Sequence, residues 1–252
     1  GKTAKKYVMP DGVTTIGNNA FYRCNNLTSI TIPDGVTTIG NKAFASCDNI
    51  TSITISDSVT SIGDDVFNYC GNLTFINVDS DNKYYASEDG VLFNKDKSVL
   101  VLYPMGKTAK KYVMPDGVTT IGNNAFDRCD NLTSITIPDS VTTIGNKAFD
   151  NCDSLTSITI PDGVTTIGNN AFYGCYNLTS VTIPDSVTSI ADDAFNYCND
   201  LTSINVDSNN KYYLSEDGVL FNEDKSVLVR YPMGKKAEEY VIHATVTTIG
   251  NY

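Results

Sequence analysis

Apolar and polar positions follow one another along this chain in a pattern that returns every 23 residues. One copy spans 27–47, and its apolar side chains are Leu27, Ile30, Ile32, Val36, Ile39, Ala43, Phe44 and Cys47. Apolar residues at alternate positions predict a short strand whose Ile30 and Ile32 face the interior. The residues Pro33, Asp34 and Gly35 predict a turn that brings the chain back toward the core.

The second half of each copy has a different spacing. Ala43, Phe44 and Cys47 stand at positions i, i+1 and i+4, which share one face of a helix, so the spacing predicts a helical turn. Asn41 precedes this segment where an N-cap residue would lie, and the other copies have Asn or Asp there. Each 23-residue copy is therefore predicted to form one coil made of a strand, a corner and a return.

One coil alone buries too few side chains to offset the entropy of ordering its backbone, so the coils must stack and share their buried faces. The period is marked by cysteines in two groups with 23-residue spacing: Cys24, Cys47 and Cys70, then Cys129, Cys152, Cys175 and Cys198. Equivalent residues of the two groups, such as Cys70 and Cys198, are 128 residues apart. We expect one solenoid over 1–252 with internal modules 1–105 and 106–233.

Two insertions interrupt the period, near 79–111 and 207–239. Two β-rich runs in 90–104 flank a polar segment and predict a β-hairpin, which 218–232 repeats. The sequence leaves open where these hairpins lie relative to the other strands. Residues 1–21 recur unchanged at 106–126, so we interpret the chain as a fragment of a longer array.

The repeated line LxxIxIPxxVxxIGxxAFxxCxx, found at 27–49 as LTSITIPDGVTTIGNKAFASCDN, resembles the BspA-like (Treponema pallidum-type) leucine-rich repeat. The resemblance covers essentially the whole chain, with small departures such as Ser56 for Pro, Val66 for Ala and Ala191 for Gly. It implies an α/β repeat: a curved, right-handed solenoid with short parallel strands on the concave face and helical turns and short strands on the convex face. It also implies a bacterial surface or secreted protein for adhesion or host-protein binding, with no catalysis.

Charge and chemistry narrow the function further. The net charge of −11 argues against nucleic acid and anionic membranes as partners. No apolar run approaches 18 residues, so we expect no direct membrane insertion. No catalytic or nucleotide-binding motif is found, and we expect a non-enzymatic monomer with no cofactor and no metal.

The seven cysteines form a line of one residue per coil instead of converging on a point, as metal ligands would. Disulfides between adjacent coils are possible by distance, but all seven side chains would point the same way into the core. We interpret them as buried free thiols that pack as small hydrophobes.

If the isoleucines of each strand point inward, the residues on either side of them point outward. This places a hydroxyl-rich, nearly uncharged surface on the concave face, which we predict to be the binding site, with tyrosines of the insertions as anchors. The predicted site residues are Ser29, Thr31, Ser52, Thr54, Phe75, Asn77, Tyr84, Tyr85, Ser134, Thr136, Ser157, Thr159, Ser180, Thr182, Ser203, Asn205, Tyr212 and Tyr213. The predicted partner is an extracellular or host protein.

Three alternatives stay open from sequence alone. The same face could bind a glycan, or the array could be a rigid spacer that holds another domain away from the cell. The regular Ser-x-Thr array also resembles threonine-rich ice-binding solenoids, so ice binding is the third alternative, and it rests on an analogy of fold only.

Overall fold

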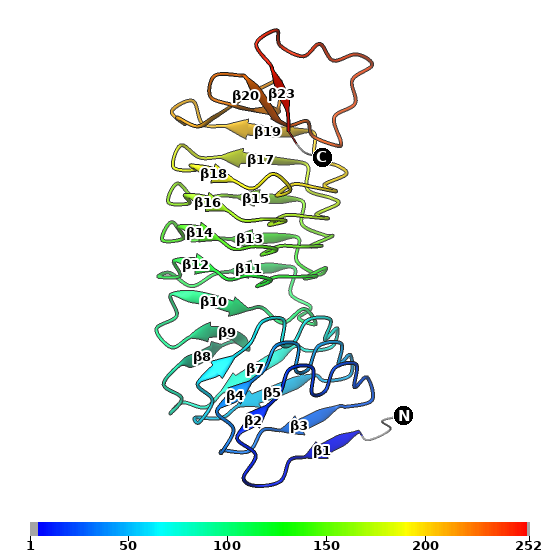
Figure 1. Ribbon diagram of the computed structural model, residues 1–252, viewed down its shortest axis with the longest axis vertical. Helices are drawn as coiled ribbons and strands as arrows, with labels where there is room; N and C mark the ends of the chain where they lie inside the picture. Colours follow the sequence, from blue (N-terminus) through cyan, green and yellow to red (C-terminus); the bar gives the residue numbers. More distant parts are fainter. Residues whose placement is uncertain (1–4, 251–252) are drawn as a thin grey trace. The chain divides into compact units, whose positions relative to one another are not determined.

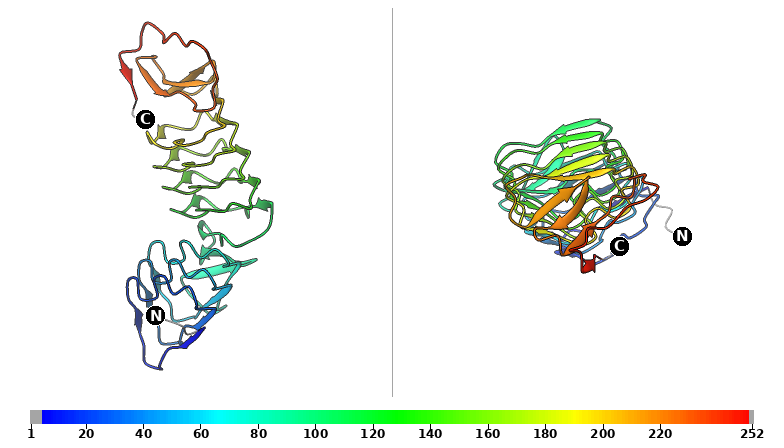
Figure 2. Two further views of the ribbon diagram at one scale, coloured as in Figure 1. Left: turned by 90° about the vertical axis from the view of Figure 1, so that its right-hand side faces the viewer. Right: turned by 90° about the horizontal axis from the view of Figure 1, so that it is seen from above.

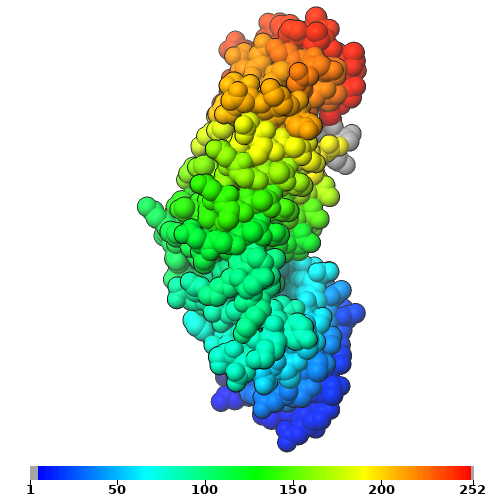
Figure 3. Space-filling view, turned by 90° about the vertical axis from the view of Figure 1, so that its left-hand side faces the viewer, coloured from blue at the N-terminus to red at the C-terminus, as the bar shows by residue number. Residues whose placement is uncertain are grey.

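The computed structural model describes residues 5–250. The chain divides into two compact units, Gly1–Thr108 and Ala109–Tyr252, and each is a stack of coils (Figures 1 and 2). Within each unit the coils follow one another in the order of the sequence, as the colours of Figure 3 show. The regular secondary structure of the described residues consists of β-strands.

The strands of the first unit are β1 (Lys6–Val8), β2 (Thr15–Ile16), β3 (Ser29–Thr31), β4 (Thr38–Ile39), β5 (Ser52–Ile55), β6 (Ser61–Ile62), β7 (Phe75–Val78), β8 (Tyr85–Glu88), β9 (Val91–Asn94) and β10 (Val99–Leu102). Those of the second unit are β11 (Lys111–Val113), β12 (Thr120–Ile121), β13 (Ser134–Thr136), β14 (Thr143–Ile144), β15 (Ser157–Thr159), β16 (Thr166–Ile167), β17 (Ser180–Ile183), β18 (Ser189–Ile190), β19 (Ser203–Val206), β20 (Tyr213–Glu216), β21 (Val219–Asn222), β22 (Val227–Arg230) and β23 (Thr248–Ile249).

Each coil contributes one strand to each of two rows. The S-x-T row contains β1, β3, β5 and β7 in the first unit and β11, β13, β15, β17 and β19 in the second. The T-I row contains β2, β4 and β6, then β12, β14, β16 and β18. Paired strands within a row are parallel and shifted by one 23-residue period, so that Ser157 lies opposite Ser180 and Ser180 opposite Ser203. The predicted solenoid of stacked coils with parallel strands is therefore confirmed.

The core of each unit lies between the two rows. Ile30 and Ile32 are buried, as the alternation predicts. The phenylalanines of successive coils stack face to face, with ring centroids 5.3 Å apart for Phe21 and Phe44 and 5.8 Å for Phe44 and Phe67. Identical side chains therefore meet one another at the coil interfaces, which gives each added coil an apolar surface that matches the last one.

The prediction of helical turns is wrong. In the segment that contains Ala43, Phe44 and Cys47, the backbone N–H groups alternate between two kinds of partner. Ala43 and Cys47 donate three residues back, to Gly40 and Phe44, whereas the N–H of Phe44 donates 3.0 Å to Val66 O in the next coil. Lys42 and Ser46 have positive φ angles of 55° and 58°. The segment is therefore a chain of tight turns, because bonds between coils replace the i to i−4 bonds of a helix.

Asn41 does not cap a helix either. Its Oδ1 accepts from the N–H of Asp64 one coil further on, at 3.0 Å, and Asn18 Oδ1 accepts from the N–H of Asn41 at 2.8 Å. Gly63 precedes the donor Asp64, and a Cβ on Gly63 would collide with the Asn41 side chain. Asn18, Asn41, Asn123 and Asn146 each accept in this way from the next coil, so these asparagines form a ladder that ties neighbouring coils together.

All seven cysteines are buried free thiols, as predicted. They also make a contact that the sequence did not suggest: the Sγ of Cys70 donates to Phe44 O in the preceding coil at 3.1 Å, and Cys47 and Cys198 make the same bond. Burial raises the pKa of Cys47 to about 11 and of Cys70 and Cys198 to about 12. The thiols of Cys47, Cys70 and Cys198 are therefore held neutral and act as hydrogen-bond donors between coils.

Each insertion forms an antiparallel meander of three strands, one more than the predicted hairpin: β8, β9 and β10, and later β20, β21 and β22. In the second unit β22 pairs in parallel with β23, a Thr-Ile strand, so the end of the meander extends the T-I row. The turn before the second meander strand reaches the other row, where Gly90 O accepts from Ile76 N at 3.0 Å. The meander thus crosses the core from one row to the other.

A buried asparagine fastens each meander to the coil before it. Asn82 has no exposed surface, and its Nδ2 donates to Ser56 O and Val59 O at 2.7 and 2.9 Å. Its Oδ1 accepts from the N–H groups of Tyr84 and Tyr85, both at 2.8 Å. Asn210 makes the equivalent four bonds in the second unit.

Candidate functional site

The S-x-T row presents the predicted surface. In the first unit Ser52 and Thr54 lie opposite Phe75 and Asn77. In the second unit three coils align, so that Thr159 lies opposite Thr182 and Thr182 opposite Asn205. The parallel register therefore gathers residues 23 positions apart into two lines of mostly short polar side chains on each unit.

The side chains at the two outward positions are free, whereas neighbouring threonines are not. Thr156 and Thr179 donate their Oγ1 hydrogens to carbonyls of the preceding coil. In the part of the chain that the structure describes, the hydroxyls of Ser157, Thr159, Ser180 and Thr182 form no hydrogen bond with the protein. Thr159 and Thr182 are also exposed. These hydroxyls are thus available to a partner.

The first coil of each unit adds two kinds of residue that sequence reasoning missed. Lys6 and Val8 lie opposite Ser29 and Thr31, and Lys111 and Val113 lie opposite Ser134 and Thr136. Val8 is 80% exposed and Val113 is 71% exposed. The sequence does indicate their position, because each of these residues stands one 23-residue period before a predicted residue of the face. The face of each unit therefore begins with a cation and an open apolar side chain.

Phe75 lies at the other end of the face in the first unit. Its side chain is 45% exposed, and one side of the ring is covered by Gly90, whose positive φ of 78° and missing Cβ permit the close approach. In the second unit Gly218 lies in the same way against Ser203, which is half-buried. The turn of each meander therefore bounds the face.

The structure separates the two members of each predicted tyrosine pair. Tyr84 is 53% exposed and Tyr212 similarly so. Tyr85 is half-buried, and its hydroxyl accepts from Ile62 N at 3.0 Å, as Tyr213 does from Ile190 N. Tyr85 and Tyr213 therefore cap the last strand of the T-I row before each meander, Ser61–Ile62 and Ser189–Ile190. Of these four tyrosines, Tyr84 and Tyr212 are the two that are more than half exposed, and both belong to the insertions.

Residues 5–250 were compared with the arrangements needed for a metal site and for a membrane-spanning helix. No group of three or more His, Cys, Asp or Glu side chains in this range is arranged to hold a metal ion. The same range contains no helix that is long and apolar enough to cross a bilayer. The S-x-T face presents hydroxyl groups that can donate and accept hydrogen bonds, and a few apolar side chains border them.

A stack of strand-and-turn coils with a fixed residue period defines a solenoid repeat protein. The chain belongs to the family of the BspA type leucine rich repeat region, which matches in six copies over residues 2–90 and 105–217. The resemblance noted from the sequence is therefore confirmed. The family is one of repeat scaffolds, and no catalytic family is among the matches.

Solved structures of bacterial leucine-rich-repeat proteins are similar to this chain. A leucine rich cell surface protein from Faecalibacterium prausnitzii is 35% identical over 81% of this chain and 60% of its own, with a TM-score of 0.67. The pneumococcal vaccine antigen PcpA is 28% identical over 82% of this chain and 52% of its own, with a TM-score of 0.77. A leucine-rich repeat protein from Eubacterium ventriosum is 25% identical over 97% of this chain and 72% of its own, with a TM-score of 0.64.

The chain thus spans little more than half the length of the first two of these proteins. A comparison with curated proteins found no match. The class supported by these findings is a protein-interaction scaffold related to bacterial surface proteins and antigens.

Proposed function

We propose that this chain is a non-catalytic recognition module of a bacterial surface or secreted protein. It binds proteins of a host or of neighbouring cells through the S-x-T face. The observation that carries the proposal is the set of exposed hydroxyls, aligned by the strand register and left without hydrogen bonds to the protein, while the threonine beside them in each coil is bonded.

The composition of the face suits a protein partner. Each hydroxyl contact contributes only about 0.5–1.5 kcal/mol net, so the polar lines give orientation more than affinity. Affinity comes from apolar groups that a partner can cover, and Val8, Val113 and Phe75 are the exposed apolar residues of the face. Tyr84 and Tyr212 serve as anchors at the insertions. The names of the F. prausnitzii protein and of PcpA support a location at the cell surface.

A matched pair of substitutions tests the proposal. Thr182 and Ser189 belong to the same coil and are both exposed, but Thr182 lies in the S-x-T row and Ser189 in the T-I row. We would screen the purified chain by biolayer interferometry against extracellular-matrix proteins and glycans. For each partner found, Thr182→Glu should weaken binding by at least about tenfold, or about 1.4 kcal/mol, whereas Ser189→Glu should leave it unchanged.

A second pair of variants tests the apolar anchors. Phe75→Ala combined with Tyr84→Ala should weaken binding while the fold persists, because both side chains are half exposed. Equal effects of Thr182→Glu and Ser189→Glu would place binding elsewhere. Absence of any partner in the screen would favour a rigid spacer, and partners found only among glycans would assign the face to carbohydrate.

A further inference from the structure

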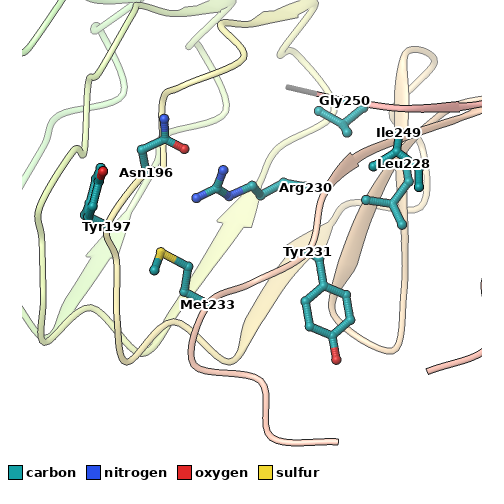
Figure 4. A pocket seen from close by; sticks show the side chains of 9 residues that line it. Asn196, Tyr197, Leu228, Arg230, Tyr231, Met233, Ile249 and Gly250 are labelled. Atoms are coloured by element: carbon teal, nitrogen blue, oxygen red, sulfur yellow. The ribbon is translucent and has the colours of Figure 1, made fainter. Parts of the chain in front are cut away.

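The turn segments of the second unit carry a cluster of tyrosines outside the S-x-T face. Tyr173 packs against Tyr197 of the next coil, with ring centroids 4.9 Å apart and ring planes at 54° to each other. Tyr176, from the same turn segment as Tyr173, is 38% exposed. Figure 4 shows Tyr197 beside Asn196 on the turn segment of its coil. Tyr69 occupies the place of Tyr197 in the first module and is 48% exposed, against 51% for Tyr197, so this exposure belongs to the position.

One coil of the first unit shows which chemistry such a tyrosine accepts. The segment FYRCNN of that coil aligns by the repeat with FYGCYN of the second unit, so Arg23 stands where Gly174 does. The guanidinium carbon of Arg23 lies over the Tyr22 ring, 5.3 Å from its centroid, which is a cation–π contact. Among the residues that the structure describes, no lysine or arginine lies over the ring of Tyr173. Tyr173 therefore keeps the aromatic half of this contact and lacks the cation.

The backbone does not require a glycine at residue 174. Gly174 has a φ of 67°, and Arg23, Asn151 and Tyr197 have positive φ angles at the equivalent places of other coils. A Cβ on Gly174 would lie 2.5 Å from Asn151 Oδ1. The glycine therefore places an acceptor oxygen of the preceding coil, instead of a side chain of its own, beside Tyr173.

The packing of the coils does not require these tyrosines either. In the first unit Ala45 and Asp48 stand in one coil where Tyr173 and Tyr176 stand in this one. That coil stacks on its neighbours through the same phenylalanine and cysteine contacts. The two rings are therefore a feature of the surface of this coil.

Negative charge surrounds the cluster. Its own turn segment has no charged residue, whereas the turn segments of the neighbouring coils, 145–155 and 191–201, have five carboxylates and one lysine. These residues are Asp150, Asp153, Asp192, Asp193 and Asp200, and Lys147. Burial, followed by the neighbouring Tyr197 and Asp150, raises the pKa of the Tyr173 hydroxyl. A cation that approaches the rings is therefore attracted by the surrounding charge.

We propose that the cluster of Tyr173, Tyr176 and Tyr197 binds an arginine side chain of a partner polypeptide. The guanidinium lies against the rings, as that of Arg23 lies over Tyr22, and the neighbouring carboxylates complement its charge. Arginine suits the cluster better than lysine, because its planar head stacks on aromatic rings and is more weakly hydrated. The cluster lies on the turn segments and not on the S-x-T row, so this inference does not depend on the proposed function.

An NMR titration of the whole isotope-labelled chain tests the proposal. The probe is the tripeptide Gly-Arg-Gly with blocked ends, and the same peptide with citrulline in place of arginine is a neutral control of the same shape. The arginine peptide should shift the amide signals of Gly174 and Tyr176. It should bind at least about fivefold more tightly than the citrulline peptide, as expected for a cation–π contact at a partly exposed site.

Tyr173→Ala is the matched variant, because Ala45 shows that alanine fits the equivalent place. It should weaken binding of the arginine peptide at least about fivefold and leave urea unfolding close to that of the wild type. Gly174→Arg restores the sequence FYRC and should block the cluster with its own guanidinium.

Three results would overturn the proposal: equal binding of the two peptides, amide shifts confined to other parts of the chain, or undiminished binding by Tyr173→Ala. Tighter binding of tetramethylammonium than of the arginine peptide would also overturn it, because the cluster would then select small organic cations. The comparison of the two peptides uses only wild-type protein, so it decides the matter even if a variant fails to fold.

Discussion

Replacement of Asn82 should destabilise the first unit more than the small size of the asparagine side chain suggests. Asn82 is fully buried and makes four hydrogen bonds, two to carbonyls of the preceding coil and two from the N–H groups of Tyr84 and Tyr85. At about 0.5–1.5 kcal/mol net for each bond, Asn82→Ala should lower the free energy of unfolding by roughly 2–6 kcal/mol. Some of that loss is recovered if water enters the space that the amide leaves.

Asn82→Asp separates the donors from the acceptor. An aspartate keeps an oxygen for Tyr84 and Tyr85 but loses both donated bonds and faces two carbonyl oxygens with a buried negative charge. Its folded-state pKa should therefore be raised, so the variant should recover stability relative to wild type as pH falls and the carboxyl becomes protonated. At neutral pH it should be at least as unstable as Asn82→Ala.

Urea unfolding followed by circular dichroism gives the free energies, and hydrogen exchange of the Tyr84 and Tyr85 amides reports the local effect. Asn210→Ala provides a replicate in the second unit. Asn72→Ala is the exposed control, because its Nδ2 makes one bond to Asp48 O at 2.7 Å, and it should cost less than about 1 kcal/mol. If Asn82→Ala unfolds within about 1 kcal/mol of wild type, the reasoning about buried amide bonds is refuted.

Two further predictions concern the cysteine ladder and the tyrosine pairs. The Cys70 pKa rises from 9.0 to about 12 on folding. The stabilising contribution of this thiol is therefore fully present below about pH 9 and is lost as the pH rises above that value. At one pH unit above the unfolded pKa, the free energy of unfolding falls by about 1.4 kcal/mol for each such thiol. Urea unfolding should show a smaller alkaline loss for Cys70→Ala than for wild type, and equal losses would contradict the neutral-donor role. Tyr85→Phe should cost about 1 kcal/mol, because Ile62 N–H loses its acceptor, while Tyr84→Phe should stay within about 0.5 kcal/mol; similar effects in urea unfolding would refute the distinction.

The core and the strands could be predicted because they depend on one quantity, the inward or outward direction of each side chain. The alternation around Ile30 and Ile32 identifies a strand, and the burial of Phe44 and Cys47 follows from the repeat. The turn segment could not be predicted in the same way. Its apolar spacing is that of a helix, and the hydrogen bond from Phe44 to Val66 that excludes a helix joins residues one coil apart.

The outward direction of the candidate site residues could be predicted in part, for a related reason. Ser29 and Thr31 follow from alternation within their own strand, whereas Val8 follows only when the 23-residue register is extended back to a line of different sequence. Tyr85 was misleading, since nothing in the local sequence indicates that its hydroxyl reaches Ile62. The structural role of Asn82 was hidden likewise, although its recurrence as Asn210 in the second module was a visible signal.

Two physical causes can keep the same residue at equivalent positions of the 23-residue repeat, and they can be distinguished residue by residue. Asn41, Phe44 and Cys47 each contact an adjacent coil through a hydrogen bond or a stacked ring, so a change in one coil disturbs its fit to a neighbour. Thr159 and Thr182 lie opposite each other but are exposed, and their hydroxyls make no such bond in the described chain. Coil stacking therefore explains the first group and leaves the hydroxyls of the second unexplained. The proposed function accounts for them, because a partner bound to the S-x-T face would contact this regular polar surface.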